Sequence, residues 1–487
     1  MGEVKSSSLA KMLLLGIFFV LIVYKVFKSY HGYPKVYMGQ PLPPGPNWSL
    51  PLIGHLYLFK ANPIETFMEM AKQLGGIFMF DFGPKTTVIL LDPDLIDQAM
   101  KIDALPSRPL KEMESQALIR GERNPDGSLP GIAFADGTSW KDQRKFAFSQ
   151  LISLGFGRNV DIEEVIRSEC DAMVQKLKQT SKDGTVPVII DTNNFIGNAL
   201  NVVWHFVSGN PVRMSDELLR VPQHFATIFS NIDEAHHVPG SENDAHKKSF
   251  DPNLVRDFID AYLKKIQDTK DPTSSFHEQR GEVNMRNSMF DLFIAGMDTT
   301  ATTLSWGLIY MMKWPEIQVK VQEEIARVIG NDTPSLNHRS KTPYVEATLL
   351  EIQRLACIVP WGPRATLDDV QLGPYVIPKN THVLYIIQNL THNPKFFPEP
   401  NHFKPERFLS DDGTKFIRDE RVATFGLGKR KCPGENMARM ELYLFFVTLL
   451  KNFKFRSDVN PREINIEGDL GLVLEPKPCS TRLEIRK

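Results

Sequence analysis

The chain has 487 residues, 42% of them hydrophobic and 24% charged, and a formal net charge of -1. These values are typical of a folded globular protein and exclude extended disorder, while the length allows several ordinary domains or one large one. The near-zero net charge argues against nucleic acid or another polyanion as a partner. Four widely scattered cysteines match no zinc-binding spacing and predict a reducing compartment for the main body; they are Cys170, Cys357, Cys432 and Cys479.

The N-terminal segment contains an uninterrupted apolar run over residues 12–24. This length fits the apolar region of a signal peptide, but no small-x-small cleavage site follows, and flanking lysines can lengthen a membrane span by snorkelling. We therefore interpret residues 1–33 as a retained signal-anchor helix and residues 34–487 as one folded domain. Lysines after the helix favour a cytoplasmic body, although lysines before it weaken that preference. The proline-rich residues 42–46 are expected to form a rigid spacer next to the membrane.

The first part of the body is expected to form a β-hairpin over residues 76–91. Its β-branched and aromatic residues flank a turn at Gly83-Pro84-Lys85. Asp92 is then expected to cap a helix that ends near residue 102.

Two helices are expected in the middle of the chain. The first opens at Asp136 and carries Trp140 and Arg144, which share one face because they are four residues apart. By itself this pair is a weak signal, because a surface helix with one aromatic residue is common. The second helix is expected over residues 254–267, with its apolar residues on one side.

A helix of roughly 40 Å is expected from residue 285 to 313, where Trp314-Pro315 ends it. Its middle contains the sequence Ala295-Gly296-Met297-Asp298-Thr299-Thr300. Glycine costs about 1 kcal/mol relative to alanine in a helix, and threonine side chains compete for backbone carbonyls. Such a local violation is expected where function requires it; the alternative is an internal kink with a hydrogen-bonded aspartate.

The C-terminal part combines helices with short strands. Glu351 and Arg354 are expected to pair on a helix over residues 344–357, although exposed pairs of this kind are frequent. Strands are expected at 375–378 and 381–387, and an apolar-periodic helix at 436–455. The predicted fold class is mainly α with small β-sheets (α+β).

Residues 425–434 present Cys432 between two glycine-bearing turns. Glycine permits backbone conformations that other side chains block, Pro433 removes one N–H near the sulfur, and a helix N-terminus behind it favours an anion. These features lower the free-energy cost of a thiolate. Cys432 is therefore interpreted as a metal ligand, with a buried free cysteine in a glycine-rich turn as the alternative.

The spacing of Phe425, Gly428, Arg430, Cys432 and Gly434 resembles the haem-binding loop of the cytochrome P-450 superfamily. The resemblance implies the cytochrome P-450 fold, as a single large domain behind a membrane anchor. It also implies haem b (iron protoporphyrin IX) as cofactor, with the Cys432 thiolate as axial iron ligand. The implied cofactor-binding residues are Phe425, Arg430, Cys432, Gly434, Trp140, Arg144, Arg364, Ala295 and Gly296.

Two further motifs carry the same resemblance. The Ala295–Thr300 sequence resembles the oxygen-binding signature of the family, in which Gly296 leaves room for dioxygen above the haem. The match implies that Thr299 hydrogen-bonds dioxygen there and that Asp298 takes part in proton delivery. Glu351, Arg354 and Arg407 match a structural set, in which Arg407 bridges to Glu351 behind the cysteine loop.

The run after Phe425 resembles animal microsomal members, which implies a haem-thiolate monooxygenase in the endoplasmic reticulum membrane, single-pass, with its catalytic domain on the cytosolic face. Such an enzyme inserts one atom of dioxygen into a lipophilic small molecule, such as a steroid, fatty acid or xenobiotic. Because no nucleotide-binding glycine motif follows a strand, electrons from NADPH must arrive through another protein. The implied donor is NADPH-cytochrome reductase, with cytochrome b5 as an optional second donor. Basic residues near the cysteine are expected either to meet an acidic reductase surface or to form a solvated patch; they are Lys429, Lys431 and Arg439.

One region departs from the family pattern. Members carry a long helix over the substrate pocket, but residues 238–252 offer only a short polar stretch here. The pocket roof is therefore open, or the sequence derives from an incomplete gene model. Two alternatives follow: a non-catalytic haem-binding membrane protein or degenerate member, and redox-independent isomerisation at the same site. The Asp298-Thr299 pair favours oxygen activation, because a carrier needs no proton relay.

Overall fold

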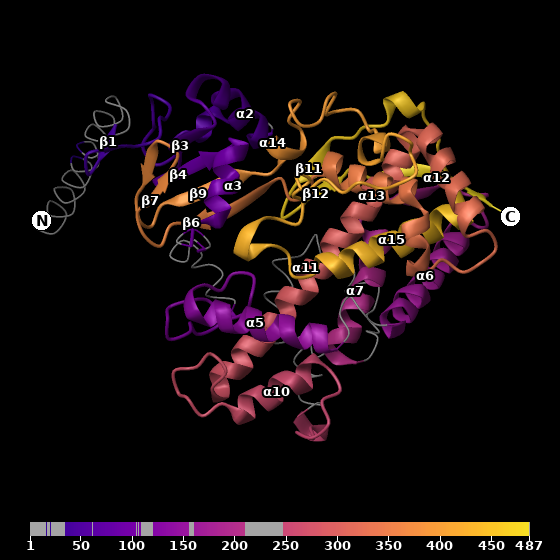
Figure 1. The fold of residues 1–487 in the computed structure, drawn as a ribbon, viewed down its shortest axis with the longest axis horizontal. Helices are drawn as coiled ribbons and strands as arrows, with labels where there is room; N and C mark the ends of the chain where they lie inside the picture. The colour runs from indigo at the N-terminus through magenta and orange to yellow at the C-terminus, as the bar shows by residue number, and fades with distance from the viewer. Residues whose placement is uncertain are drawn as a thin grey trace, which may run out of the picture. The chain divides into compact units, whose positions relative to one another are not determined.

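The computed structural model describes Gly16, Val20 and residues 35–60, 62–103, 105, 107–108, 120–154, 160–209 and 247–486. The chain divides into two compact units, which are described separately (Figure 1). Unit 1 comprises residues 1–109, 361–390 and 426–431, and unit 2 comprises residues 110–360, 391–425 and 432–487. Apart from Gly16 and Val20, the predicted anchor lies outside the described residues, as does most of the short 238–252 region. Within the described ranges, no helix has both the length and the apolar character that a membrane span requires.

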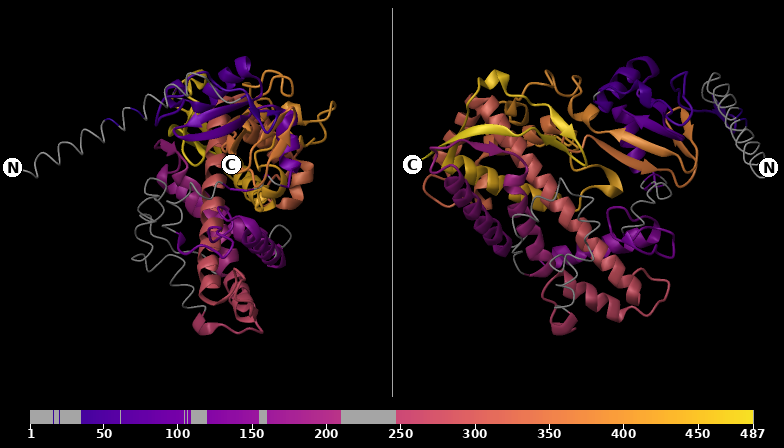
Figure 2. Two further views of the ribbon diagram at one scale, coloured as in Figure 1. Left: turned by 90° about the vertical axis from the view of Figure 1, so that its left-hand side faces the viewer. Right: turned by 180° about the vertical axis from the view of Figure 1, so that it is seen from behind.

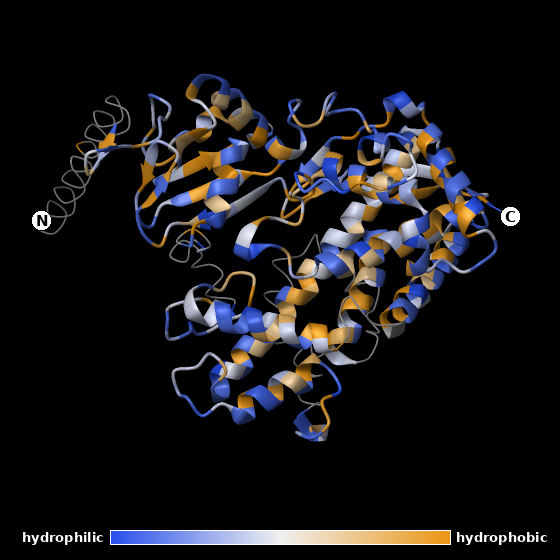
Figure 3. Cartoon of the chain, viewed as in Figure 1, coloured by the Kyte–Doolittle hydropathy of each residue, from blue (hydrophilic) through white to orange (hydrophobic). Residues whose placement is uncertain are grey.

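Unit 1 is built on a four-stranded sheet in the order β3-β4-β9-β6. The predicted hairpin is confirmed: β3 (Ile77–Phe82) and β4 (Lys85–Leu90) are antiparallel, and β4 then pairs in parallel with β9 (His382–Ile386). The other edge strand is β6 (Trp361–Ala365). Phe67 of α2 (Pro63–Leu74) packs edge-on against Phe80 of β3, with 5.3 Å between ring centroids. The strands are mostly hydrophobic in Figure 3, and the first four residues of β3 are buried on both faces of the sheet.

The remaining elements of unit 1 are short. Asp92 caps α3 as predicted, by accepting hydrogen bonds from the Asp94 and Leu95 amides. The elements are β1 (Val36–Tyr37), β2 (Gln40–Pro41), η1 (Leu56–Leu58), α3 (Pro93–Lys101), β7 (Val370–Leu372), β8 (Tyr375–Ile377) and η6 (Gly428–Arg430). The short helix α14 (Gln388–Thr391) follows β9.

Unit 2 is organised around α11 (Glu278–Lys313), a helix of 36 residues and therefore roughly 54 Å. Both views in Figure 2 show this long helix running through the unit, and α7, α10, α13 and α15 pack against it. Its C-terminal half is buried on all sides and ends at Trp314-Pro315 as predicted. The other helices are α5 (Gly137–Ser153), α6 (Val160–Thr180), α7 (Asn193–Ser208), α10 (Phe258–Asp268), α12 (Pro315–Val328), α13 (Pro343–Ala356) and α15 (Glu435–Asn452).

Among the described residues, unit 2 also contains two small sheets and three 3₁₀ helices. The first sheet has the strand order β10-β13-β5 and the second is the β11-β12 hairpin. The strands are β5 (Val188–Ile190), β10 (Phe453–Ser457), β11 (Gly468–Leu470), β12 (Leu474–Pro476) and β13 (Cys479–Ile485). The 3₁₀ helices are η4 (Leu336–Lys341), η5 (Pro405–Phe408) and η7 (Pro461–Glu463).

Three predicted helix boundaries were wrong. Helix α10 begins at Phe258, not at 254, because the Asp257 side chain accepts a hydrogen bond from the Asp260 amide and caps it there. Helix α11 begins seven residues before the predicted 285. Helix α15 ends at Asn452, and the last apolar residues of the predicted 436–455 helix belong to β10, whose alternate residues Phe453 and Phe455 are buried.

Candidate active site

The cysteine loop has the geometry that its glycines permit. Gly426 and Gly428 have φ values of +76° and +65°, in the left-handed region where other residues are strained. The Cys432 amide donates to the Phe425 carbonyl at 2.8 Å and closes the loop. Gly434 is the N-cap residue of α15 and offers no side-chain cap. The helix begins at Glu435, so its first amides lie three residues beyond an exposed cysteine. Their partial positive charge favours a thiolate.

The other three cysteines are poor candidates for a thiolate. Burial raises the pKa of Cys170 and of Cys357 to about 12, and it also raises the pKa of Cys479. None of the four forms a disulfide. Cys432 is therefore the side chain that is both exposed and next to a helix N-terminus.

Arg439 packs against the ring of Phe425 in a cation–π contact. Its guanidinium lies 4.9 Å from the centroid of the Phe425 ring and 3.0 Å from Glu435 Oε1, and its side chain is only 14% exposed. Arg418 also contacts Glu435 Oε1, at 2.6 Å. The expectation that Arg439 forms part of a basic docking surface was therefore wrong, because its charge is used inside unit 2. Lys431 is exposed, and Lys429 is 52% exposed and contacts Asp103 at 2.5 Å.

The middle of α11 has an accessible strip, which consists of Ala295, Gly296 and Thr299. Ala295 is exposed and Thr299 is half-buried, whereas Asp298 and Thr300 are buried. Thr299 Oγ1 donates to the Ala295 carbonyl at 2.7 Å, one turn earlier. Burial raises the pKa of Asp298 to about 6, and the nearby negative charge of Glu475 acts in the same direction. An acid poised in this way can carry a proton near neutral pH.

Gly296 has a packing role that its motif did not predict. A Cβ atom built on it would lie 2.4 Å from Val203 Cγ2 of α7. The glycine therefore lets α7 approach α11 closely, whatever room it also leaves for dioxygen.

The residues predicted to bind haem divide between the units. In unit 2, Trp140 is 4% exposed and Arg144 lies 5.9 Å from its ring centroid, so the two share a face of α5. That helix is held at its start by Asp126 Oδ2, which accepts from the Ser139 amide at 2.8 Å, while Asp136 makes no side-chain cap. Arg364 and Arg430 belong to unit 1.

Comparison with known proteins places these features in one family. The family model for cytochrome P450 matches residues 43–238 and 194–483. Cytochrome P450 2B4 of Oryctolagus cuniculus is 32% identical over 90% of this chain and 92% of its own length. Cytochrome P450 2C41 of Canis lupus familiaris is 34% identical (87% and 90%), and cytochrome P450 2J2 of Homo sapiens is 32% identical (89% and 89%). The chain belongs to the cytochrome P450 family.

Membership confirms the predicted fold, the enzyme class and the cofactor. As a cytochrome P450, the chain is a monooxygenase, an oxidoreductase that uses haem with an axial cysteine thiolate. Its helical body with small sheets is the fold of this family, and the matches extend over both compact units.

One buried arginine of unit 1, Arg364, has surroundings that fit the binding of a haem. Arg364 is 3% exposed. Its guanidinium donates hydrogen bonds to the Tyr385 hydroxyl at 3.0 Å and to the carbonyl of the neighbouring Pro363 at 2.9 Å. Among the residues that the structure describes, no carboxylate pairs with it, and burial lowers its pKa. A buried guanidinium without a counter-charge is costly, and an anionic ligand group such as a haem propionate would relieve that cost.

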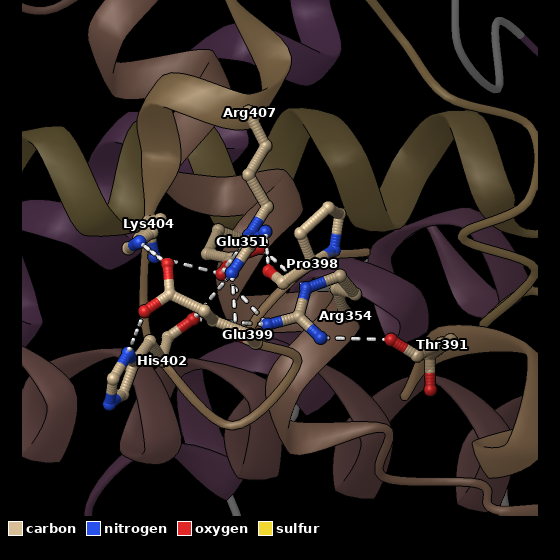
Figure 4. A network of polar contacts seen from close by, with 8 residues as sticks. All are labelled: Glu351, Arg354, Thr391, Pro398, Glu399, His402, Lys404 and Arg407. Atoms are coloured by element: carbon tan, nitrogen blue, oxygen red, sulfur yellow. Dashed lines mark hydrogen bonds and ion pairs between the residues drawn. The ribbon is translucent and has the colours of Figure 1, made fainter. Parts of the chain in front are cut away.

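The predicted structural set forms a buried ionic network in unit 2 of this cytochrome P450 (Figure 4). Arg354 makes two hydrogen bonds to the Glu351 carboxylate, at 2.6 and 2.8 Å, and both side chains are 0% exposed. Arg407 Nε lies 3.3 Å from Glu351 Oε1, and the Lys404 amide donates to the same oxygen at 2.8 Å. Arg354 also donates to the Thr391 carbonyl at 2.8 Å. These additional bonds offset the desolvation of the buried pair.

A second buried ion pair was not predicted. Arg120 Nη2 contacts Asp291 Oδ1 at 2.6 Å, and Asp291 Oδ2 accepts from the Ile132 and Ala133 amides at 2.7 and 2.9 Å. The network ties the loop before α5 to the N-terminal half of α11. Its signal in the sequence was an aspartate one turn before Ala295, in an apolar part of a helix, where a buried acid requires a partner.

Glu441 of α15 was also missed. It is 1% exposed, burial raises its pKa to about 8, and a hydrogen bond from the Thr300 side chain opposes that rise. Within the described residues its Oε2 atom has no hydrogen-bond partner. The folded protein therefore holds a neutral acid between the helix that follows Cys432 and the helix that carries Thr299.

Glu441→Gln is expected to change how the stability of this cytochrome P450 depends on pH. The folded-state pKa is raised, so the folded state keeps a proton that the unfolded chain releases, and wild-type stability falls as pH rises from about 4.5 to about 8. The neutral amide removes this loss, so the variant should match the wild type near pH 5 and exceed it near pH 8.5 by on the order of 3 kcal/mol. Denaturant unfolding at both pH values measures the difference, with exposed Glu467→Gln as control. Parallel pH profiles for Glu441→Gln and the wild type would contradict the prediction.

Proposed function

We propose that Cys432 is the axial thiolate ligand and that the chain oxidises a lipophilic small molecule, such as a steroid, fatty acid or xenobiotic. The observation that carries this proposal is that Cys432 is exposed beside the N-terminus of α15, whereas burial raises the pKa of the other three cysteines. Haem, when bound, supplies the oxidising chemistry, using dioxygen and electrons from NADPH that a reductase delivers. Phe425, Gly434, Trp140, Arg144, Arg364 and Arg430 remain the predicted residues for binding it.

The chain's own part in the reaction is to deliver protons and exclude water. Thr299 presents a hydroxyl on the accessible strip of α11, held by the Ala295 carbonyl at 2.7 Å. Asp298, with a pKa of about 6, can hold a proton one residue away and release it. Around them, Met297 and most of the C-terminal half of α11 are buried, which limits access of bulk water.

Thr299→Ala is expected to separate electron use from product formation. In the wild type with added reductase, substrate should stimulate NADPH consumption, and the reduced carbon-monoxide complex should show the spectrum of a haem-thiolate protein. In the variant NADPH is still consumed, but product per NADPH should fall on the order of tenfold, because a group that guides proton transfer is lost. Thr303→Ala is the matched control, because Thr303 Oγ1 donates to the carbonyl one turn earlier in the same way, at 2.8 Å, but is buried.

Each outcome of this experiment discriminates between functions. Haem binding without substrate-stimulated NADPH consumption in the wild type would favour the non-catalytic carrier or the degenerate member with a shortened roof. Conversion of substrate without NADPH would favour isomerisation. Equal coupling in Thr299→Ala and Thr303→Ala would contradict the role of Thr299.

The proposed location is the endoplasmic reticulum membrane, with a single N-terminal span and the catalytic part in the cytosol. Support comes from apolar side chains that unit 1 exposes directly after residue 33: Met38 is 81%, Leu52 68% and Trp48 53% exposed. Large apolar side chains that are exposed near an apolar segment suit an apolar environment, and a bilayer is the one that such a segment would supply.

Trp48 is expected to report this contact. In vesicles whose acyl chains carry bromine, a quencher of indole fluorescence, the full-length wild type should be quenched, and Trp48→Phe should lose part of that quenching because an indole in the bilayer has been removed. Trp204→Phe is the control, because Trp204 is 4% exposed. Quenching that is the same in Trp48→Phe and the wild type would show that Trp48 does not enter the bilayer.

The proposed electron donors are NADPH-cytochrome reductase and, as an optional second donor, cytochrome b5. With Arg439 excluded, exposed Lys429 and Lys431 remain the basic residues of the cysteine loop that can meet an acidic partner.

A further inference from the structure

Three carboxyl groups of unit 2 form a series from the surface to the interior that ends at Asp298. Asp469 on β11 is exposed, Glu475 on β12 is half-buried, and Asp298 on α11 is 8% exposed. Asp469 and Glu475 are direct cross-strand partners. Like charges placed opposite one another destabilise a strand pair, so this arrangement opposes stability and indicates another use.

Strand β12 of the β11-β12 hairpin packs against α11. Trp306 Nε1 donates to the carbonyl of Leu474, the neighbour of Glu475, at 2.9 Å. Asp298, Thr302 and Trp306 are four residues apart and therefore share one face of α11. The contact is close, because a Cβ atom built on Gly468 would lie 2.9 Å from Trp306 Cζ2. The charge of Glu475 consequently reaches Asp298 and raises its pKa.

Two buried polar atoms on this face have no hydrogen-bond partner among the described residues. They are Asp298 Oδ1 and Thr302 Oγ1, and Thr302 is 0% exposed. The Thr302 hydroxyl is nevertheless near enough to Asp298 to oppose part of the rise in the pKa of that carboxyl. Buried polar groups that lack a protein partner are usually satisfied by water. Asp191 also lies near this face, because its backbone carbonyl accepts a hydrogen bond from Ser305 Oγ of α11 at 3.1 Å. Burial is the larger cause of the raised pKa of Glu475, and the charges of Asp469 and Asp191 raise it further.

We propose that Glu475 relays protons from solvent to Asp298 through water bound between Thr302 and the two carboxyl groups. The proposal rests on the role of Asp298 given above and adds the entrance of the path. Asp298 gives up its proton and becomes a carboxylate, Glu475 returns a proton to it through water, and Glu475 is protonated again from solvent at the hairpin. No electron moves in these steps. Glu475 acts through Asp298 and is a positioning residue for its protonation.

The test uses the full-length holoenzyme with reductase. Glu475→Gln should lower product per NADPH on the order of tenfold, because the neutral amide cannot carry an acidic proton. It should also move the infrared titration of the Asp298 carboxyl in the resting enzyme to lower pH, because a neighbouring negative charge has been removed; Asp298→Asn identifies the band. Exposed Glu467→Gln should change neither quantity.

The relay requires both changes. An Asp298 titration equal to that of the wild type, or coupling equal to that of Glu467→Gln, would overturn it. Should Glu475→Gln fail to fold, Glu475→Ala, which also removes the carboxyl group, carries the same two measurements, and unchanged values would again overturn the relay. Uncoupling in Thr299→Ala with normal coupling in Glu475→Gln rejects the relay alone, whereas normal coupling in Thr299→Ala rejects the proposed function on which it rests.

Discussion

Cys432→Ser is expected to abolish NADPH-supported oxidation and to remove the thiolate signature from the spectrum of the reduced carbon-monoxide complex. A serine hydroxyl is not ionised at neutral pH, so it cannot replace a thiolate as a donor to iron. The fold should persist, because Cys432 is exposed and the amide that closes the loop on the Phe425 carbonyl is unchanged. Exposed substitutions usually alter stability by less than about 0.5 kcal/mol.

Cys479→Ser is the control for this experiment. Cys479 begins β13 and is half-buried, and burial raises its pKa, so its loss should leave spectrum and activity unchanged. If Cys432→Ser kept the thiolate spectrum, the ligand would be another cysteine. If Cys479→Ser lost the thiolate spectrum, the assignment of Cys432 as the ligand, which rests on its exposure, would be wrong.

Arg354→Met is expected to destabilise the protein by roughly 3–5 kcal/mol, enough to unfold much of it in cells. The substitution leaves the Glu351 carboxylate at 0% exposure, and its remaining partners in the described part of the chain are Arg407 Nε and the Lys404 amide. It also deprives the Thr391 carbonyl of its bond from Arg354. Denaturant midpoints of the purified variants measure the loss.

Lys320→Met is the matched control for Arg354→Met. It also removes a cation paired with a glutamate, but Lys320 and Glu406 are 53% and 49% exposed, so the loss should stay below about 1 kcal/mol. Adding Glu351→Gln to Arg354→Met should recover part of the stability, because the uncompensated charge disappears. Equal losses in Arg354→Met and Lys320→Met would contradict the importance of burial.

Local features of the fold could be predicted because each depends on neighbouring residues. The β3-β4 hairpin followed from alternating apolar residues around Gly83-Pro84, and the end of α11 from Trp314-Pro315. The Glu351 and Arg354 pair followed from a three-residue spacing, although only the structure shows that both are fully buried.

Features that depend on distant parts of the chain could not be predicted. Arg120 and Asp291 are 171 positions apart, and nothing near either residue identifies the other. Arg439 is basic and close to Cys432, but its direction is set by Phe425 and Glu435, so charge alone gave the wrong interpretation. Glu475 reaches Asp298 only because the β11-β12 hairpin packs on α11.

The contact between Gly296 and Val203 restricts the order in which substitutions can accumulate. A methyl group at 296 would lie 2.4 Å from Val203 Cγ2, so Gly296→Ala requires a shift of the Val203 side chain or of α7 against α11, unless Val203 has already become smaller. If Val203→Ala occurs first, Gly296→Ala can follow without this overlap. The reverse order passes through a strained single variant. The size of the side chain at position 203 thus determines whether a larger residue can be accepted at position 296, in evolution or in design.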